Sequence, residues 1–333
     1  MAVSVRDVAE DAGVSVGTVS NVLNRPEKVS AETVARVQSA IARLGFVRND
    51  AARQLRAGRS RTIGLVVLDL RNPFFTEVAR GAEERANAHG LTVLVANSDE
   101  NADREAVHLD LFEEQRALGV LVTPVAENIP RLALMRDRGI PTVLVDRESR
   151  DVRFASVAVD DVEGGRVAAE HLLSVGRRRL AFVGGPVSIR QVSDRLEGAQ
   201  AAVAAAGAAL EFIGTAALTV DEGRRVGEQL LSRDPVSRPD AIFAANDLLA
   251  LGILQSLVMT GDVHVPADIA LIGYDDIDFA SAAVIPLSSM RQPAALIGST
   301  AVDLLLAMQD AGGEAQRHVV FQPELVVRAS TVG

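Results

Sequence analysis

Apolar, strand-like segments alternate with amphipathic helical stretches from Thr62 almost to the end of the chain, and this alternation restricts the fold more than any other feature. Strands are expected at 62–69, 91–97, 119–123, 142–146, 157–160, 180–184, 241–246 and 269–274. Repeated βα units predict parallel sheets wound with helices on both faces. About 270 residues of this pattern suit two such lobes better than one sheet. The predicted class is therefore α/β.

Composition agrees with buried parallel sheets. Hydrophobic residues make up 48% of the chain but aromatic residues only 3%, so the core must consist of Val, Leu, Ile and Ala. The chain has no cysteine, which excludes disulfides and cysteine-bound zinc. Neither a secretory signal nor an apolar run of about 18 residues is present. We therefore expect a cytoplasmic protein with no membrane partner.

The first 46 residues have a different pattern, with three short helices. Ser4 begins one helix, which stops at Gly13, and Ser15 is placed to cap the next. Ser30 is placed to cap a third helix, which Gly45 ends. Two short helices joined by a tight turn and packed on a third are typical of a helix-turn-helix. A plain three-helix bundle with solvated polar positions is the alternative that these residues leave open.

Charge is distributed unevenly between this head and the rest. Residues 1–60 hold nine Arg and Lys against six acidic residues, a net charge of +3. The remainder holds 25 basic and 38 acidic residues, a net charge of −13. A modestly basic head on an acidic body permits nucleic-acid binding at one end. Charge alone does not distinguish a nucleic-acid-binding head from an ordinary uneven distribution of charged residues.

Several motifs in order resemble the LacI/GalR (lactose-repressor) family. The head carries DVAEDAGVSVGTVSNVLN and then RPEKVSAETVARVQSAIARLGFVRNDAARQLRAGRS; the body carries TIGLVVLDLRNPFF, VLVDRES, AANDLLALG and IGYDD. The resemblance implies a helix-turn-helix head, a hinge helix and a periplasmic-binding-protein-like body of two doubly wound lobes. It also implies a homodimer that reads a pseudo-palindromic operator in double-stranded DNA.

The domain boundaries follow from the same resemblance. The head is expected at 1–48 and the hinge helix with its linker at 49–60. The first lobe is expected at 61–158 and 289–316, and the second at 159–288 and 317–333. The chain would then cross between the lobes near Ala158, Ser289 and Arg317.

The resemblance assigns roles on the second helix of the head. Val16, Gly17 and Asn21 match the base-reading positions, and Thr18 and Ser20 match positions that contact phosphates. Gly17 has no side chain to read a base, so Val16 and Asn21 are expected to discriminate more. Val can meet a thymine methyl, and Asn can bind an adenine edge.

In the hinge, the resemblance makes Leu55 a wedge that enters the minor groove and kinks the site. Ala52 and Arg53 would lie against the groove beside it. Read from its own residues, this segment is only a linker, because so short an isolated helix is unstable in water.

Polar residues punctuate the carboxyl ends of the predicted strands, where open α/β sheets bind ligands. Singly, each is better explained as a helix cap or turn, and the two adjacent phenylalanines as a hydrophobic staple. Their recurrence in both lobes instead favours a binding site. The candidate effector-binding residues are Asp69, Asn72, Phe74, Phe75, Asp146, Arg147, Arg195, Asn246, Tyr274, Asp275 and Gln292.

This set suits a small sugar, because carboxylates and amides orient hydroxyl groups and aromatic rings cover a sugar face. It resembles the pocket of ribose-binding proteins, with Thr123 and Leu218 as departures. A monosaccharide is therefore expected, with ribose one candidate. Arg147 and Arg195 could instead hold an anionic group, as in a sugar phosphate.

Catalysis has little support in the sequence. GGPVS is not a nucleophile elbow, the histidines lack ligand spacing, and no phosphate-binding loop occurs. We expect no enzyme activity, no metal and no cofactor. A periplasmic sugar carrier would share the body but not the head. Whether the sugar relieves or enhances repression stays open.

Overall fold

The computed structural model describes residues 3–46, 60–125, 129–149, 151, 153–260, 262–310 and 318–332. The chain divides into two compact units, Met1–Arg59 and Ser60–Gly333. Among the helices in these described ranges, none combines the length and the apolar character that a membrane span requires.

The head is a bundle of helices closed by short polar caps. Ser4 and Asp7 form the predicted capping box, and Ser15 and Ser30 accept hydrogen bonds at the starts of the next two helices. Gly45 ends the last helix in a left-handed conformation (φ 64°). The elements are α1 (Val5–Asp11), α2 (Val16–Asn24), the 3-10 turn η1 (Pro26–Lys28) and α3 (Ala31–Leu44). Their small core is aliphatic: Val8, Ala9, Ala12, Val19, Val22, Val37 and Ala40.

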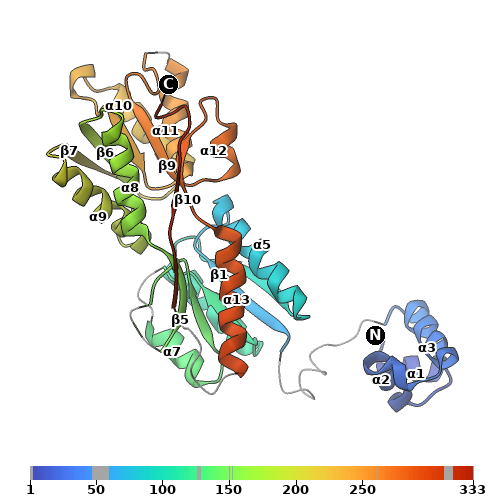
Figure 1. Ribbon diagram of the computed structural model, residues 1–333. Helices are drawn as coiled ribbons and strands as arrows, with labels where there is room; N and C mark the ends of the chain where they lie inside the picture. Colours follow the sequence, from blue (N-terminus) through green and yellow to red (C-terminus); the bar gives the residue numbers. More distant parts are fainter. Residues whose placement is uncertain are drawn as a thin grey trace. The chain divides into compact units, whose positions relative to one another are not determined.

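The body contains two six-stranded sheets, one in each lobe (Figure 1). The first has the order β11-β5-β4-β3-β1-β2 and the second β12-β10-β9-β8-β6-β7. Every pairing is parallel except the one between β10 and β12. The strands of the first sheet are β1 (Thr62–Val67), β2 (Thr92–Asn97), β3 (Gly119–Val122), β4 (Thr142–Val145), β5 (Ala155–Val159) and β11 (His318–Phe321). Those of the second are β6 (Arg179–Gly184), β7 (Ala209–Gly214), β8 (Ala241–Ala244), β9 (Ala270–Asp275), β10 (Ser288–Arg291) and β12 (Glu324–Val326).

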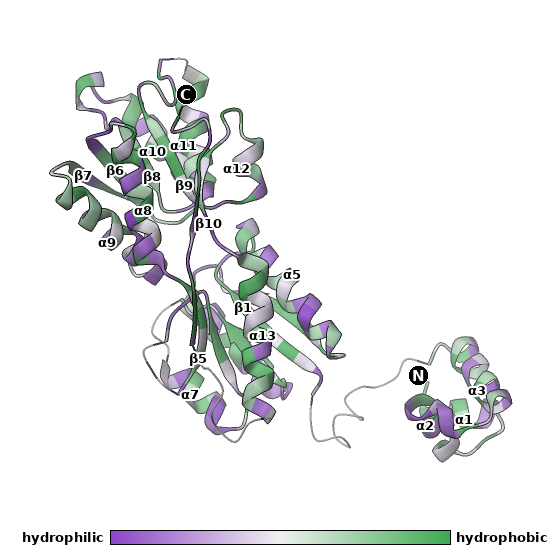
Figure 2. Ribbon diagram, viewed as in Figure 1, coloured by the Kyte–Doolittle hydropathy of each residue, from purple (hydrophilic) through white to green (hydrophobic). Residues whose placement is uncertain are grey.

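Helices cover both sheets, and Figure 1 shows α13 beside α5 and α8 beside α9. Central strands such as β3, β4 and β8 are buried along their whole length, whereas the edge strands β2 and β7 are largely exposed. Figure 2 shows hydrophobic residues along strands such as β1 and β5, and a mixture of hydrophobic and hydrophilic residues along helices such as α5 and α7. The helices of the first lobe are α5 (Pro73–Ala88), α6 (Ala102–Glu114), α7 (Ile129–Asp137) and α13 (Ala294–Asp310). The second lobe has α8 (Asp161–Ser174), α9 (Arg190–Ala205), α10 (Val220–Leu231), the 3-10 turn η2 (Pro235–Ser237), α11 (Asp247–Thr260) and α12 (Asp278–Ala282).

Sheet membership moves the predicted crossings between lobes a few residues along the chain. The first lies after Val159, close to the expected Ala158. The second follows Arg291 rather than Ser289, because 288–291 pairs with β9 in the second sheet. The third follows Phe321 rather than Arg317, because 318–321 pairs with β5 in the first sheet. Residues 289–291 thus belong to the second lobe and residues 318–321 to the first. The expected ranges 289–316 and 317–333 are wrong at these ends.

Candidate effector cleft and DNA-facing helix

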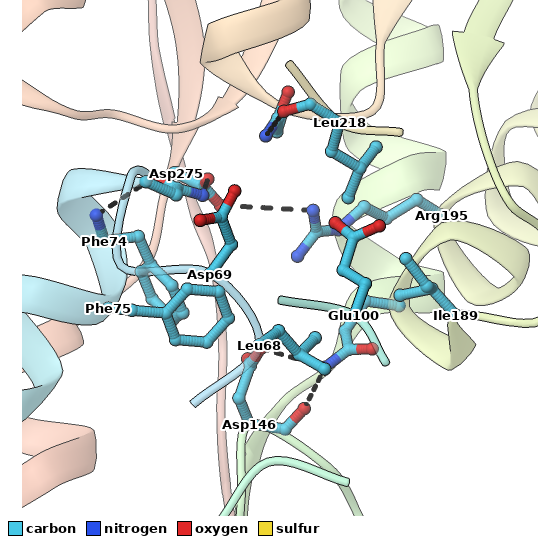
Figure 3. A pocket seen from close by; sticks show the side chains of 13 residues that line it. Leu68, Asp69, Phe74, Phe75, Glu100, Asp146, Ile189, Arg195, Leu218 and Asp275 are labelled. Carbon is cyan, nitrogen blue, oxygen red and sulfur yellow. Dashed lines mark hydrogen bonds and ion pairs between the residues drawn. The ribbon is translucent and has the colours of Figure 1, made fainter. Parts of the chain in front are cut away.

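A cleft lies where the carboxyl ends of the strands of both lobes meet, and it is open to solvent with about 420 Å³ of empty space (Figure 3). The volume that the centre of a water-sized molecule can reach is only about 30 Å³, so side chains nearly fill the cleft in this structure. Its lining mixes carboxylates, amides and one guanidinium with apolar side chains: Leu68, Asp69, Asn72, Phe74, Phe75, Glu100, Asp146, Ile189, Gln191, Arg195, Leu218, Asn246 and Asp275. Eight of the eleven residues predicted from the sequence are among them.

The other three predicted residues do not line the cleft. Tyr274 is fully buried behind it, because neighbouring residues of a strand face opposite ways and Asp275 takes the side facing the cleft. Gln292 is buried and donates to Asp275 Oδ1 at 2.7 Å, so it positions that carboxylate. Arg147 follows Asp146, whose backbone is left-handed (φ 56°), and the Arg147 amide donates to Val157 on the neighbouring strand.

Hydrogen bonds join the lobes across the cleft at two places. Asn72, at the start of α5, donates to Asp275 Oδ2 in the other lobe at 2.7 Å. Gln191 on α9 donates to Asp146, at 2.6 Å to its carbonyl and 2.9 Å to Oδ2. The side-chain oxygen of Asn72 also accepts from the Phe74 amide at 3.1 Å, so this residue caps α5 as well. Groups that bind one another across a cleft are also those a ligand would reach.

Arg195 is held by contacts on several sides. Its Nε donates to Asp161 at 2.7 Å, and its Nη1 donates to the Ala245 carbonyl at 2.8 Å. The guanidinium carbon lies 3.6 Å from the centre of the Tyr274 ring, as in a cation–π contact. Arg195 is only 4% exposed, so its charge is balanced by protein groups at close range.

Burial raises the pKa of several carboxyl groups at this cleft. The pKa of Asp275 rises to about 6 because of burial, with Arg195, Asn72 and Gln292 opposing the shift. Burial and the charge of Asp69 raise the pKa of Glu100 to about 7. The pKa of Asp146 lies well above its ordinary value, because burial and the charge of Asp161 outweigh Arg195.

Of the two polar residues at the start of α11, Asp247 is not the helix cap. Asn246 caps the helix instead, because its Oδ1 accepts from the Leu249 amide at 2.9 Å. Asp247 is fully buried and accepts from the Ser289 hydroxyl at 2.7 Å and from the Ile277 amide at 2.9 Å. Asp247 therefore links the segment after β9 to β10 within the second lobe.

Five lining residues were not among the predicted ones. Gln191 precedes Arg195 by one helical turn, so the i, i+4 spacing could have indicated it. Glu100 follows the predicted strand at 91–97 by three residues, as Asn72 follows the predicted strand at 62–69, so the same pattern could have indicated it. Leu218 had been noted only as a departure from the ribose pocket, and the apolar Leu68 and Ile189 carry no signal that separates a pocket wall from core.

In the head, α2 presents a continuous outer face. Val16, Gly17 and Asn21 are exposed, and Thr18 and Ser20 are partly exposed. Val19 and Val22 point into the core, which fixes the orientation of the helix. The Thr18 hydroxyl contacts Ser15 Oγ at 2.9 Å, and the Ser20 hydroxyl accepts from Asn24 at 3.3 Å. The hinge residues Ala52, Arg53 and Leu55 lie outside the described residues.

Within the described ranges, no group of three or more His, Asp or Glu side chains is arranged to hold a metal ion. The cleft lining contains no hydroxyl, imidazole or amine side chain. Its carboxyl, amide and guanidinium groups can form hydrogen bonds, and its apolar side chains can pack against a ligand.

Two family models match the chain. The model for bacterial regulatory proteins of the lacI family covers residues 4–49, and the model for a periplasmic binding protein-like domain covers residues 169–331. The first matches the unit that contains α2, and the second covers most of the second lobe.

Known proteins resemble the chain along nearly its whole length. The ribose operon repressor of Bacillus subtilis (strain 168) is 34% identical over 92% of this chain and 91% of its own. The solved lac repressor dimer, bound to operator and the anti-inducer ONPF, is 27% identical with a TM-score of 0.84 and full coverage of both chains. A LacI family regulator from Enterococcus faecium with bound ribose is 26% identical, with a TM-score of 0.74 over 81% of this chain and 98% of its own. The chain belongs to the LacI family of bacterial regulatory proteins.

Proposed function

We propose that the protein is a cytoplasmic transcriptional repressor that binds a pseudo-palindromic operator as a homodimer and responds to a small sugar in the cleft. The observation that carries this proposal is that a helix with an exposed polar face and a cleft lined by hydrogen-bonding groups belong to one chain. Support comes from the relatives: one is a ribose operon repressor, one is a dimer bound to operator, and one holds ribose.

In the head, Val16, Gly17 and Asn21 are proposed to face base edges, with Thr18 and Ser20 at phosphates. Residues 1–48 form the DNA-binding domain. In the proposed hinge at 49–60, Leu55 is the minor-groove wedge, with Ala52 and Arg53 beside it.

In the body, the ligand is proposed to contact the eight lining residues that the sequence indicated. Phe74 and Phe75 pack edge to face with ring centres 5.0 Å apart and form an apolar wall suited to a sugar face. Catalysis is not part of the proposal, which rests on relatives that are repressors.

Sequence-specific DNA binding is tested by selecting bound sequences from a random duplex library and then measuring the affinity of the protein for the selected operator. The wild-type protein is expected to enrich a two-fold symmetric site, and Asn21→Ala to lose preference at one position in each half-site. Affinity should fall steeply as salt rises, because phosphate contacts release counterions. A library without a symmetric site, or a flat salt response, contradicts the proposal.

Titration of the operator complex with D-ribose and other pentoses and hexoses tests the sensing role. Release of DNA identifies an inducer, and tighter binding identifies a corepressor. A panel in which no sugar changes operator affinity contradicts sugar control.

A further inference from the structure

Carboxyl groups dominate the charge of the cleft. Asp69, Glu100, Asp146 and Asp275 line it, and Arg195 is the only cationic side chain among the described lining residues. Asp69 is partly compensated, since Arg71 Nε donates to it at 2.9 Å. A ligand that enters this space therefore meets more carboxyl groups than cationic donors.

Arg195 offsets this excess only in part, because its charge is already paired within the protein. Its Nε binds Asp161, which is 7% exposed, and its Nη1 binds a main-chain carbonyl. Turning the guanidinium toward an anion would leave the carboxylate of Asp161 buried without its partner, which is strongly unfavourable. Arg147, the other arginine that the sequence offered as an anion clamp, is not part of the lining. Nη2 of Arg195 remains able to donate to a ligand, but the only cationic charge among the described lining residues is already paired with a buried carboxylate.

Glu100 occupies an unusual backbone conformation at the mouth of this cleft. Its φ is 54°, as is that of Asp99, a left-handed region that L-residues with long side chains rarely adopt. Figure 3 shows its carboxylate pointing into the same space as the guanidinium of Arg195. Among the described residues, none donates a hydrogen bond to this carboxylate. A strained backbone that directs an unpartnered acceptor into a pocket points to a ligand contact.

Asp146 provides a second unpartnered acceptor from the opposite wall. Gln191 binds its Oδ2 at 2.9 Å, but its Oδ1 is buried without a hydrogen-bond partner among the described residues. The side chain is 3% exposed. Buried polar atoms are almost always hydrogen-bonded in native proteins, so this oxygen requires a donor from elsewhere.

We propose that Glu100 and Asp146 accept hydrogen bonds from ligand hydroxyl groups, and that the cleft thereby selects uncharged polyols and rejects phosphorylated or carboxylated sugars. This inference rests on the proposed function, because it presumes a sugar in the cleft. It names Glu100 as a contact that determines specificity and decides between the neutral and the anionic ligand classes that the sequence left open.

Isothermal titration of the full-length protein with D-ribose and D-ribose 5-phosphate tests the selectivity. The wild type is expected to bind D-ribose at least tenfold more tightly than its phosphate. Glu100→Gln should weaken D-ribose binding about tenfold, since hydrogen bonds to charged groups contribute that much, and should reduce the discrimination against the phosphate. Glu114→Gln, on the exposed end of α6, removes the same charge from the same lobe and should match the wild type.

The inference is overturned if the phosphate binds as tightly as D-ribose in the wild type, or if Glu100→Gln leaves D-ribose affinity unchanged. Thermal denaturation of each variant establishes that it is folded. If the neutral sugar binds with the expected selectivity but operator affinity does not respond, the proposed function fails and the inference stands. If only phosphorylated sugars bind and release the operator, the inference fails and the proposed function stands.

Discussion

At the scale of the residue, Arg195 shows how a single side chain serves structure and site together. It projects from α9 and touches Asp161 at the start of α8, the Ala245 carbonyl after β8 and the face of Tyr274 in β9. Since both ionic partners are buried, the pair depends on its complete set of contacts rather than on attraction alone. Arg195 lies close to the ligand space because the first turns of α9 line the cleft.

Arg195→Met is expected to destabilise the protein by about 3–5 kcal/mol, because Asp161 is left buried without its partner. Adding Asp161→Asn should recover part of the loss, which a double-mutant cycle by chemical denaturation measures. Arg166→Met on α8 removes a partly exposed arginine that pairs with Glu163 and Glu170, and it should cost less than about 1 kcal/mol. Equal losses at the two arginines would contradict this account.

Glu100 gives a pH dependence with a definite sign. Its pKa in the folded protein is raised from 4.5 to about 7 by burial and by Asp69, with Asp99 adding and Arg71 opposing. The folded state therefore holds a proton that the unfolded state has lost between these values, and stability falls as pH rises through this range. Because the side chain is partly exposed, solvent screening limits the effect to about 1 kcal/mol.

The free energy of unfolding of Glu100→Gln, minus that of the wild type, should therefore rise between pH 4.5 and 7 and stay constant above. Urea denaturation at several pH values measures this difference, and taking the difference removes the contributions of other titrating groups. A difference that stays flat with pH, or that decreases, would show that the Glu100 carboxylate is not penalised in the fold.

At the scale of the element, the close crossing of α5 and α13 depends on two glycines. A Cβ on Gly298 would lie 1.9 Å from the Val78 carbonyl oxygen, and a Cβ on Gly81 would lie 2.0 Å from that of Ala295. The helices thus approach until backbone meets backbone. Because α13 belongs to the segment that returns to the first lobe, this crossing fixes the segment against α5, whose first residues line the cleft.

Gly298→Ala is expected to lower the free energy of unfolding by about 2–3 kcal/mol, since the methyl group forces the helices apart. Ser299→Ala, the next residue on α13, has a hydroxyl that bonds only within the helix, so its loss should be small. Thermal and urea denaturation of both variants compare them. A Gly298→Ala protein as stable as the wild type would mean that the crossing relaxes without cost.

Sequence reasoning was reliable where a local pattern is sufficient and failed where tertiary geometry decides. The caps at Ser4, Ser15 and Ser30 form as predicted because each needs only residues within one turn. The strands 288–291 and 318–321 were missed because they are short and each exists only by pairing with a distant strand. The same distinction holds in the cleft. The position of Asp275 at a strand end indicated correctly that it lines the cleft, but only the pleat of the folded strand shows that the neighbouring Tyr274 faces away from it.

At the scale of the whole molecule, the body is two lobes joined by direct hydrogen bonds across the ligand space. Asn72 with Asp275, and Gln191 with Asp146, connect groups that follow strands of different sheets. A ligand that satisfies Asp146 and Asp275 from within the cleft competes with these bonds or adds to them. Either way it changes the relative stability of lobe arrangements, which is the property a sensor requires.

If a sugar in the cleft alters operator affinity, then operator must alter sugar affinity by the same factor, because the two equilibria form one thermodynamic cycle. Coupling of this kind is typically about 5–150-fold. Titrating D-ribose into the protein alone and into its complex with the selected operator measures one side of the cycle, and titrating operator at zero and saturating D-ribose measures the other. A scrambled duplex of the same length is the control and should leave sugar affinity unchanged. Unequal factors would show that the ligand acts at a second site or changes the oligomeric state, and a factor of one would show that the cleft and the operator-reading helix are energetically independent.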